Sequence, residues 1–255
     1  MPPGPVVLCY LSAPTLTNAA ALTAPVAILA GGLATRLRPI TQTIPKSLVD
    51  VCGESFLAHQ LRLLRSQGVG QVVMCVGYLG EQIEEAIGSG EAFGLRVRYS
   101  FDGDKLLGTG GALRRALGML GDEFFVMYGD SYLPCDYRAV LASFRASGLQ
   151  ALMTVYRNEG QFDVSNVEFE AGTIRRYDKT ARSPAMHHID YGLGAFRKEA
   201  FAEVPEGAKL DLAQLYQTLL ANGQLAGYEI SERFYEIGSI AGLEEFRGLM
   251  ETRRP

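Results

Sequence analysis

Residues 25–47 read PVAILAGGLATRLRPITQTIPKS. The apolar run Val26–Ala30 is typical of a strand that is buried on both faces. Gly31 and Gly32 follow it directly, and without Cβ atoms they let the backbone turn sharply and present its N–H groups to a ligand. Fixed cations come next, at Arg36, Arg38 and Lys46. A buried strand, a glycine turn and several cations together predict a site for phosphate groups.

This stretch differs from the two commonest phosphate-binding loops. The sequence holds no G-x-x-x-x-G-K-[ST] string, and the Gly31-Gly32 pair followed by Leu33 does not supply G-x-G-x-x-G. On physical grounds alone, the alternative is a glycine turn after a first strand, followed by arginines that are solvated.

The same residues resemble the N-terminal signature of the sugar-1-phosphate nucleotidyltransferases, also called nucleotide-sugar pyrophosphorylases. That pattern runs Leu-Ala-Gly-Gly, then Thr-Arg-Leu-x-Pro-x-Thr, then Pro-Lys. The matching positions are Leu29, Gly31, Gly32, Thr35, Arg36, Leu37, Pro39, Thr41, Pro45 and Lys46. Within the family, the chain resembles the short mannose- or heptose-1-phosphate guanylyltransferases and the N-acetylmuramate-1-phosphate uridylyltransferase.

The composition predicts a globular chain. It has 255 residues, of which 47% are apolar and 20% charged, and its net charge is −4. Without a basic block, a nucleic-acid or membrane partner is not expected. The four cysteines are widely spaced and form no metal-binding pair, which favours a reduced, cytoplasmic setting.

We expect residues 1–24, which carry no charged side chain, to be a disordered extension. Residues 25–255 are predicted to form one nucleotidyltransferase domain, with a nucleotide-binding part at 25–149 and a sugar-binding part at 150–255.

Strands and helices alternate along the first part. Apolar runs at 71–76 and 123–128 predict buried strands, and amphipathic stretches at 56–67 and 79–87 predict helices. Such alternation indicates an α/β fold with a doubly wound, mainly parallel, Rossmann-like sheet. Ligands of these sheets bind at the carboxyl ends of the strands, where Gly31 lies. Hairpin and strand patterns after residue 150 predict a small antiparallel, sugar-binding lobe.

A second glycine-rich stretch, Leu107–Ala112, lies between a predicted strand and a helix. Its three glycines would let a flat ring approach the backbone, although a flexible helix entry is the alternative. The resemblance implies that this stretch lies against the nucleotide base. The nucleotide-binding residues implied in this way are Leu29, Ala30, Gly31, Gly32, Thr35, Asp102, Gly108 and Gly110.

The loop before this stretch carries Asp102 and Asp104, in the region where relatives have a Gln or Glu that meets the base. A carboxylate only accepts hydrogen bonds, and guanine offers two adjacent donors, N1–H and N2–H₂. The two aspartates therefore favour guanine as the base, and either aspartate is a candidate for the acceptor. The alternative is that both merely solvate an exposed loop.

Asp130 follows a buried apolar run and Gly129, a position suited to a Mg²⁺ ion that bridges phosphates. A turn aspartate that caps its own backbone is the alternative. The resemblance implies that Asp130 binds the catalytic metal, that Glu236 is the second ligand, and that Arg36 and Lys46 are catalytic. Relatives usually have Asp at the second position, so an ordinary exposed glutamate is the alternative for Glu236.

The resemblance also implies a set of sugar-phosphate contacts in the second part of the chain. Lys179 would neutralise the sugar phosphate, and the 190–192 segment would border the sugar ring. Surface solvation is the alternative for Asn166 and Asp178. The full set is Asn166, Asp178, Lys179, Asp190, Tyr191 and Gly192.

The implied reaction joins a nucleoside triphosphate to a sugar 1-phosphate, giving an NDP-sugar and pyrophosphate. It would depend on Mg²⁺, with GTP and mannose or heptose 1-phosphate as the expected substrates. UTP or dTTP with N-acetylmuramate or glucose 1-phosphate is an alternative. A non-catalytic, nucleotide-sugar-binding regulatory subunit is another, and a homo-oligomer is left open.

Overall fold

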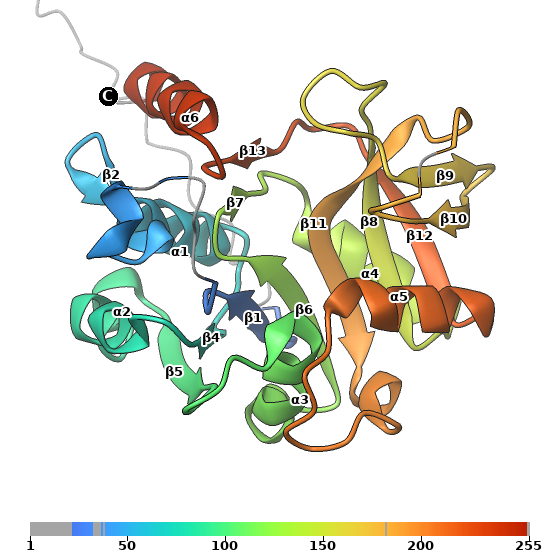
Figure 1. The fold of residues 1–255 in the computed structure, drawn as a ribbon, viewed down its shortest axis with the longest axis horizontal. Coiled ribbons are helices and arrows are strands. Elements are labelled where there is room, and N and C mark those ends of the chain that lie inside the picture. The colour runs from blue at the N-terminus through green and yellow to red at the C-terminus, as the bar shows by residue number, and fades with distance from the viewer. Residues whose placement is uncertain (1–21, 33–36, 38, 182, 254–255) are drawn as a thin grey trace, which may run out of the picture.

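The computed structural model describes residues 22–32, 37, 39–181 and 183–253. Its centre is a nine-stranded sheet (Figure 1) in the order β10-β9-β11-β6-β1-β4-β5, with β8 beside β11 and β12 beside β8. The strands are β1 (Val26–Leu29), β4 (Gln71–Val76), β5 (Arg96–Phe101), β6 (Glu123–Tyr128), β8 (Ala151–Arg157), β9 (Val167–Glu170), β10 (Thr173–Tyr177), β11 (His188–Arg197) and β12 (Leu225–Ile230).

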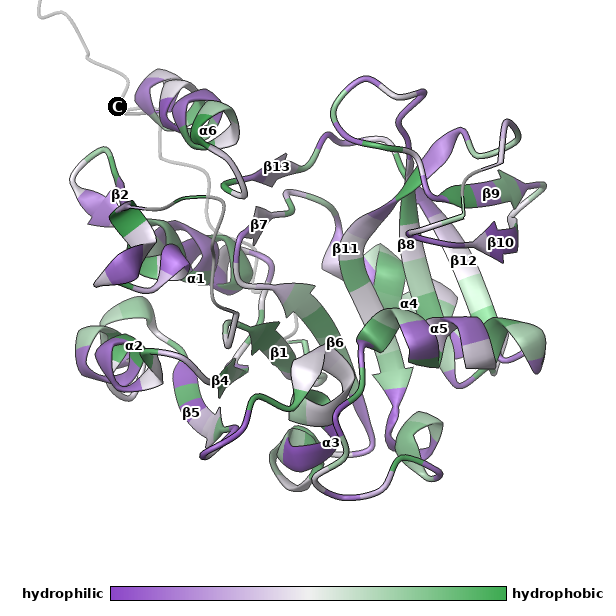
Figure 2. Cartoon of the chain, in the orientation of Figure 1, coloured by the Kyte–Doolittle hydropathy of each residue, from purple (hydrophilic) through white to green (hydrophobic). Residues whose placement is uncertain are grey.

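The four strands β6-β1-β4-β5 are parallel, as the alternation of strands and helices predicts. β1 lies inside this group, and Val26, Ala27 and Ile28 are fully buried. Because helices cover both faces of a parallel sheet, such strands read as continuous apolar runs. Figure 2 shows β1, β4 and β6 as the hydrophobic centre of the fold.

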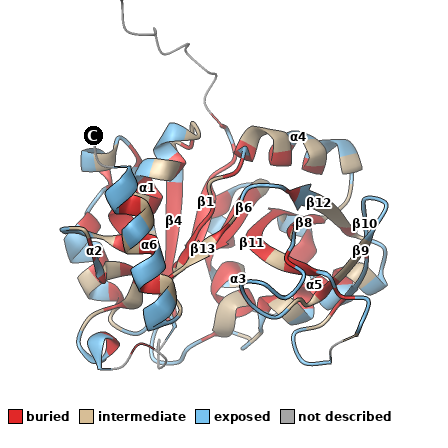
Figure 3. Ribbon diagram, turned by 90° about the horizontal axis from the view of Figure 1, so that it is seen from above, coloured by how far each residue is buried: buried red, intermediate tan, exposed pale blue. Residues whose placement is uncertain are grey.

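Helices cover the two faces of the sheet, so the expected doubly wound α/β fold is confirmed (Figure 3). One face packs against α1 (Phe56–Ser66), α2 (Gly80–Ile87) and α4 (Tyr137–Ser147). The other packs against α3 (Gly108–Leu120) and α5 (Leu212–Ala221). α6 (Ile240–Thr252) contributes Phe246, which stacks edge-on against Phe56 of α1 at 4.9 Å between ring centroids.

The second part of the chain extends the same sheet. β11 is antiparallel to β6 on one side and to β8 and β9 on the other. β12 runs parallel to β8, a pairing that breaks the antiparallel pattern expected after residue 150. Near the end of the chain, the short strand β13 (Tyr235–Glu236) pairs with β7 (Ser131–Tyr132) in a separate two-stranded sheet.

The remaining elements are short. β2 (Asp50–Val51) and β3 (Glu54–Ser55) form a hairpin, and 3₁₀ turns lie at Ile40–Gln42, Lys46–Leu48, Glu91–Phe93 and Lys198–Phe201. No helix among the described residues combines the length and apolar character needed to cross a membrane.

The described fold begins three residues before the expected boundary at 25. Leu22 is buried, and its N–H donates to Gly68 O at 2.9 Å. Leu22 and Ala24 therefore belong to the core next to α1. Residues 1–21 of the expected extension lie outside the described residues.

Candidate active site

A cavity of about 270 Å³ opens at the carboxyl ends of β1, β4 and β6. This is the edge of the sheet at which α/β folds bind ligands. Its lining includes most of the predicted nucleotide-binding positions. The lining residues are Leu29, Ala30, Gly31, Gly32, Lys46, Ser47, Cys75, Asp102, Leu106, Gly108, Thr109, Ala112, Tyr128, Gly129 and Asp130.

The two glycines after β1 are needed for different reasons. A Cβ on Gly31 would lie 3.1 Å from Gly77 N, so this glycine allows the chains after β1 and β4 to pack closely. A Cβ on Gly32 would meet nothing within 4 Å, so its backbone faces open space at the cavity. Thr35, Arg36 and Arg38 lie outside the described residues, and their predicted roles stay predictions.

Asp102 is the aspartate that reaches the cavity, whereas Asp104 is exposed in the loop beside it. Only 7% of Asp102 is exposed, and its Oδ2 accepts a hydrogen bond from Leu107 N–H at 3.0 Å. Burial raises the pKa of Asp102, while the Leu107 N–H and the nearby Arg115 oppose that rise. Of the two predicted base acceptors, the structure therefore places Asp102, and not Asp104, at the cavity.

The glycines that open α3 are packed against protein. A Cβ on Gly108 would lie 2.6 Å from Leu210 O, and one on Gly111 would lie 2.3 Å from Ala208 O. Gly110 is also turned towards this segment, because its N–H donates to Leu210 O at 2.9 Å. The close approach that these glycines permit is that of residues 208–210. Gly108 still lines the cavity, but Gly110 does not.

Lys46 and Asp130 meet at the cavity wall. Lys46 opens a 3₁₀ turn after Pro45, and Asp130 follows β6 and Gly129. The Lys46 ammonium donates a hydrogen bond to Asp130 Oδ2. A Cβ on Gly129 would lie 2.9 Å from Leu29 O, so the turn that carries Asp130 lies directly against the end of β1.

Glu236 joins this pair from β13. Its neighbour in the β13–β7 pairing is Ser131, whose hydroxyl donates to Glu236 Oε1 at 3.4 Å. Burial and the negative charge of Asp130 raise the pKa of Glu236 to about 7, with Asp163 adding to the rise and Lys46 opposing it. The two predicted metal ligands are thus close enough to repel one another.

The oxygen ligands of this pair fit Mg²⁺. That ion is commonly held by one or two carboxylates, with substrate phosphates and water completing its coordination. Among the described residues there is no group of three or more His, Cys, Asp or Glu side chains that could hold a metal alone. Asp130 and Glu236 would therefore form a half-site that a phosphate substrate completes.

Asp190 is the centre of a second polar cluster, built on β11. Its carboxylate accepts from Tyr177 Oη at 3.2 Å and from Gly192 N–H at 3.1 Å. Asn166 Oδ1 accepts from Asp190 N–H at 2.9 Å, so its amide orients this segment. Burial raises the pKa of Asp190, and Lys179 opposes that rise.

Lys179 connects the two clusters. Its ammonium lies 3.5 Å from Tyr128 Oη and 5.4 Å from the centre of that ring. Tyr128 also lines the cavity. The structure thus brings Lys179, Asn166, Asp190 and Gly192 to the side of the cavity at which Asp130 and Glu236 lie.

Two predicted sugar contacts are arranged differently. The Tyr191 side chain is fully buried in the core, where its ring packs against those of Tyr156 and Phe234. The Asp178 carboxylate accepts hydrogen bonds from Thr180 and Ala181 N–H, both at 2.8 Å, and so caps its own turn. These bonds lower the pKa of Asp178.

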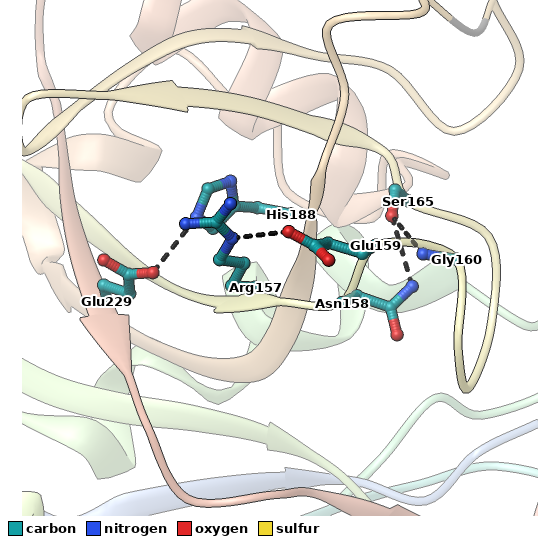
Figure 4. Close-up of polar contacts among 7 residues, drawn as sticks. All are labelled: Arg157, Asn158, Glu159, Gly160, Ser165, His188 and Glu229. Carbon is teal, nitrogen blue, oxygen red and sulfur yellow. Dashed lines mark hydrogen bonds and ion pairs between the residues drawn. The ribbon is translucent and has the colours of Figure 1, made fainter.

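The loop after β8 is a feature that the sequence did not reveal. Figure 4 shows Ser165 Oγ between Asn158 Nδ2, at 3.2 Å, and Gly160 N, at 3.3 Å. In the same region, His188 Nε2 on β11 lies 3.1 Å from Glu229 Oε1 on β12, and β8 runs between these two strands. Asn158 is fully buried, a rare state for an amide, and it holds the loop that carries Asp163.

Comparisons with known proteins identify the family of the chain. Residues 26–248 match the family model described as nucleotidyl transferase. The chain is 28% identical over 224 residues to an N-acetylmuramate alpha-1-phosphate uridylyltransferase of Neisseria meningitidis, covering 87% of this chain and 96% of the relative. It is 28% identical over 217 residues to the mannose-1-phosphate guanylyltransferase catalytic subunit beta of Xenopus tropicalis, covering 83% of this chain but 60% of that protein.

Among solved structures, HddC from Yersinia pseudotuberculosis complexed with GMP-PN superimposes with a TM-score of 0.73. It is 22% identical and the match covers 89% of this chain and 99% of that one, which shows a shared fold. The family match spans both the cavity and the Asp190 cluster. This chain belongs to the nucleotidyl transferase family.

Proposed function

We propose that the protein transfers a nucleotidyl group from a nucleoside triphosphate to a sugar 1-phosphate, with GTP and mannose or heptose 1-phosphate as its substrates. The observation that carries the proposal is the convergence of Lys46, Asp130 and Glu236 between the nucleotide cavity and the Asp190–Lys179 cluster. Two anionic substrates that meet at this point would find a cation and a pair of carboxylates suited to Mg²⁺.

The reaction is a single displacement at phosphorus. An oxygen of the sugar phosphate attacks the α-phosphorus, the bond from that phosphorus to the bridging oxygen of the β-phosphate breaks, and pyrophosphate leaves with that bonding pair. Catalysis of this kind rests on positioning and on neutralising charge. Mg²⁺ bound by Asp130 and Glu236 would supply charge neutralisation at the phosphates.

Different residues of the chain would bind different phosphate groups of the two substrates. The backbone around Gly32 faces the cavity and would hold the triphosphate. The sequence predicts that Arg36 assists in this binding. Lys46 would leave Asp130 to stabilise the charge that develops on the α-phosphate. Lys179, next to Tyr128, would hold the phosphate of the sugar.

Guanine is proposed because Asp102 offers a buried acceptor to the cavity, while Asp104 does not line it. An ionised carboxylate can accept from both N1–H and N2–H₂ of guanine, whereas uracil and thymine present one donor flanked by acceptor oxygens. The relatives named above include both a uridylyltransferase and a guanylyltransferase, so UTP and dTTP are the alternatives to test.

Pyrophosphate release from a panel of nucleoside triphosphates and sugar 1-phosphates tests the proposal. We expect release only when both substrates are present, with the highest kcat/KM for GTP. A tenfold preference for UTP or dTTP would contradict the assignment of the base. Nucleotide-sugar binding without turnover on any pair would instead indicate a regulatory subunit.

A further inference from the structure

Gln60 lies beneath the turn that carries Asp130. It belongs to the second turn of α1 and is fully buried. Its side-chain amide donates both hydrogens, one to Tyr128 O at 3.1 Å and one to Ser131 O at 2.6 Å. These two carbonyls stand on either side of the Gly129-Asp130 pair. The Gln60 side chain thus contacts both ends of the Tyr128–Ser131 turn.

The amide oxygen of Gln60 has no hydrogen-bond partner in the described part of the chain. A buried polar atom without a partner costs stability, and an apolar residue of the same size would avoid that cost. The packing of α1 alone therefore gives no reason for an amide here. What the amide adds is its pair of donors to the turn.

The backbone of the same turn is held from two other sides. Gly129 N–H donates to Leu29 O at 2.9 Å, and Ile237 N–H donates to Asp130 O at 3.0 Å. The pairing of β6 with β11 ends at Met127, one residue before Tyr128. Gln60 donates to the Tyr128 and Ser131 carbonyls from α1, outside the sheet. Because the Ser131 hydroxyl also donates to Glu236, Gln60 is connected through this turn to both the Asp130 and the Glu236 carboxylates.

We propose that Gln60 is a positioning residue for the transfer reaction, whose amide ties the Tyr128–Ser131 turn to α1 and so fixes the Asp130 carboxylate relative to Glu236. This inference rests on the proposed function. It assigns to a side chain outside the cavity the task of keeping two repelling carboxylates at a separation that one cation can bridge.

Gln60→Met tests this inference, because it keeps the length and apolar volume of the side chain and removes both donors. We expect kcat to fall at least tenfold while KM for the nucleoside triphosphate changes less than twofold. Binding of Mn²⁺, measured from the electron paramagnetic resonance signal of the free ion, should weaken severalfold even without substrates.

Leu64→Ala is the matched control. Leu64 is fully buried on the same helix and touches the core, so this variant should lower Tm at least as much as Gln60→Met does while kcat and Mn²⁺ affinity are kept. If Gln60→Met lost activity only in proportion to Tm, with Mn²⁺ affinity unchanged, the residue would be structural and the inference wrong.

Gln60→Glu gives a second, conservative test. A protonated acid keeps one O–H donor, while an ionised one has none and would face two carbonyl oxygens. The kcat of this variant relative to the wild type should therefore be highest at acidic pH and fall as the acid ionises. A constant ratio would contradict the inference. If the wild type itself shows no transfer on any substrate pair, the proposed function fails, while Mn²⁺ binding still tests the position of Asp130.

Discussion

The Lys46 ammonium donates to the Asp130 carboxylate, and both side chains are 22% exposed. The proposed reaction needs these groups in different places, with the lysine at the α-phosphate and the aspartate on the metal. Their pairing places the Lys46 ammonium next to the carboxylate that would bind Mg²⁺ in the proposed reaction. In the proposed reaction, arrival of the triphosphate would give the ammonium a new partner and release the carboxylate.

Lys46→Met should therefore affect binding and catalysis in opposite directions. Without the ammonium, Asp130 is free, and affinity for Mn²⁺ in the absence of nucleotide should rise. The kcat should fall by about 10²–10³, because an electrostatic contact to the transition state is lost. Isothermal titration with Mn²⁺ and steady-state kinetics measure the two effects. Lys198→Met, at an exposed lysine on a different 3₁₀ turn, is the control and should change neither. Weaker Mn²⁺ binding in Lys46→Met would contradict the competition.

The stability of the metal-free protein should depend on pH through Glu236. Its pKa is raised from 4.5 to about 7, so the folded state holds this proton more tightly than the unfolded chain does. Stability is then lost as the pH rises from about 4.5 through 7, by about 3 kcal/mol in total. Glu236→Gln removes the buried charge, and its Tm should exceed that of the wild type at pH 8 but match it near pH 4.

Adding Mg²⁺ provides the control for this prediction. At pH 8 the cation should raise the Tm of the wild type, because it neutralises the pair formed by Asp130 and Glu236, and it should raise the Tm of Glu236→Gln much less. Equal responses of the two proteins to Mg²⁺ would remove Glu236 from the metal site.

Two glycines of α3 allow a paired test of packing. Gly111→Ala would place a Cβ 2.3 Å from Ala208 O, so the 208–210 segment must move. We expect a loss of about 1–3 kcal/mol and a raised KM for nucleotide, because Gly108 and Thr109 line the cavity. Gly118→Ala meets nothing within 4 Å on an exposed turn of the same helix and should stabilise by about 0.5–1 kcal/mol. Thermal unfolding distinguishes them, and equal Tm changes would contradict the packing argument.

Lys179→Ala should act on one substrate only. Its ammonium lies at Tyr128, on the side of the Asp190 cluster, so KM for the sugar phosphate should rise roughly tenfold to a hundredfold while KM for the nucleotide stays constant. Lys198→Ala, at a distant exposed position, should leave both constants unchanged. A parallel rise in both KM values for Lys179→Ala would place this lysine with the triphosphate instead.

The parts of the fold that local pattern determines could be predicted. The apolar runs of β4 and β6 and the amphipathic stripe of α1 specify strand and helix without reference to distant residues. The direction of β12 could not be predicted, since its partner β8 lies about seventy residues away. α4 was missed, although the Asp136 side chain caps it by accepting from Arg138 and Ala139 N–H. An N-cap aspartate before its apolar positions was the available signal.

The site shows the same division. Gly31, Lys46, Asp102, Asp130, Glu236 and Asp190 are brought together as the resemblance implies. Tyr191 is adjacent to Asp190 in sequence, but its ring lies in the core, and only three-dimensional packing reveals this. The glycines of α3 suggested room for a base, whereas they pack against Ala208 and Leu210, and of the three only Gly108 lines the cavity. The sequence contained one indication that Gln60 has a special role, because it is an amide on the otherwise apolar face of α1.

The place of β11 in the sheet has a consequence for synthesis of the chain. β6 ends at Tyr128, but one of its two neighbours is β11, which spans His188–Arg197. While the ribosome adds the intervening residues, β1, β4 and β5 can already be parallel to one another, and the outer edge of β6 is a row of unpaired N–H and C=O groups flanked by Phe124, Phe125 and Val126. An open apolar edge of this kind pairs readily with other chains. A polypeptide truncated before residue 188 should therefore aggregate, and a chaperone that covers the β6 edge would protect the nascent enzyme until β11 inserts.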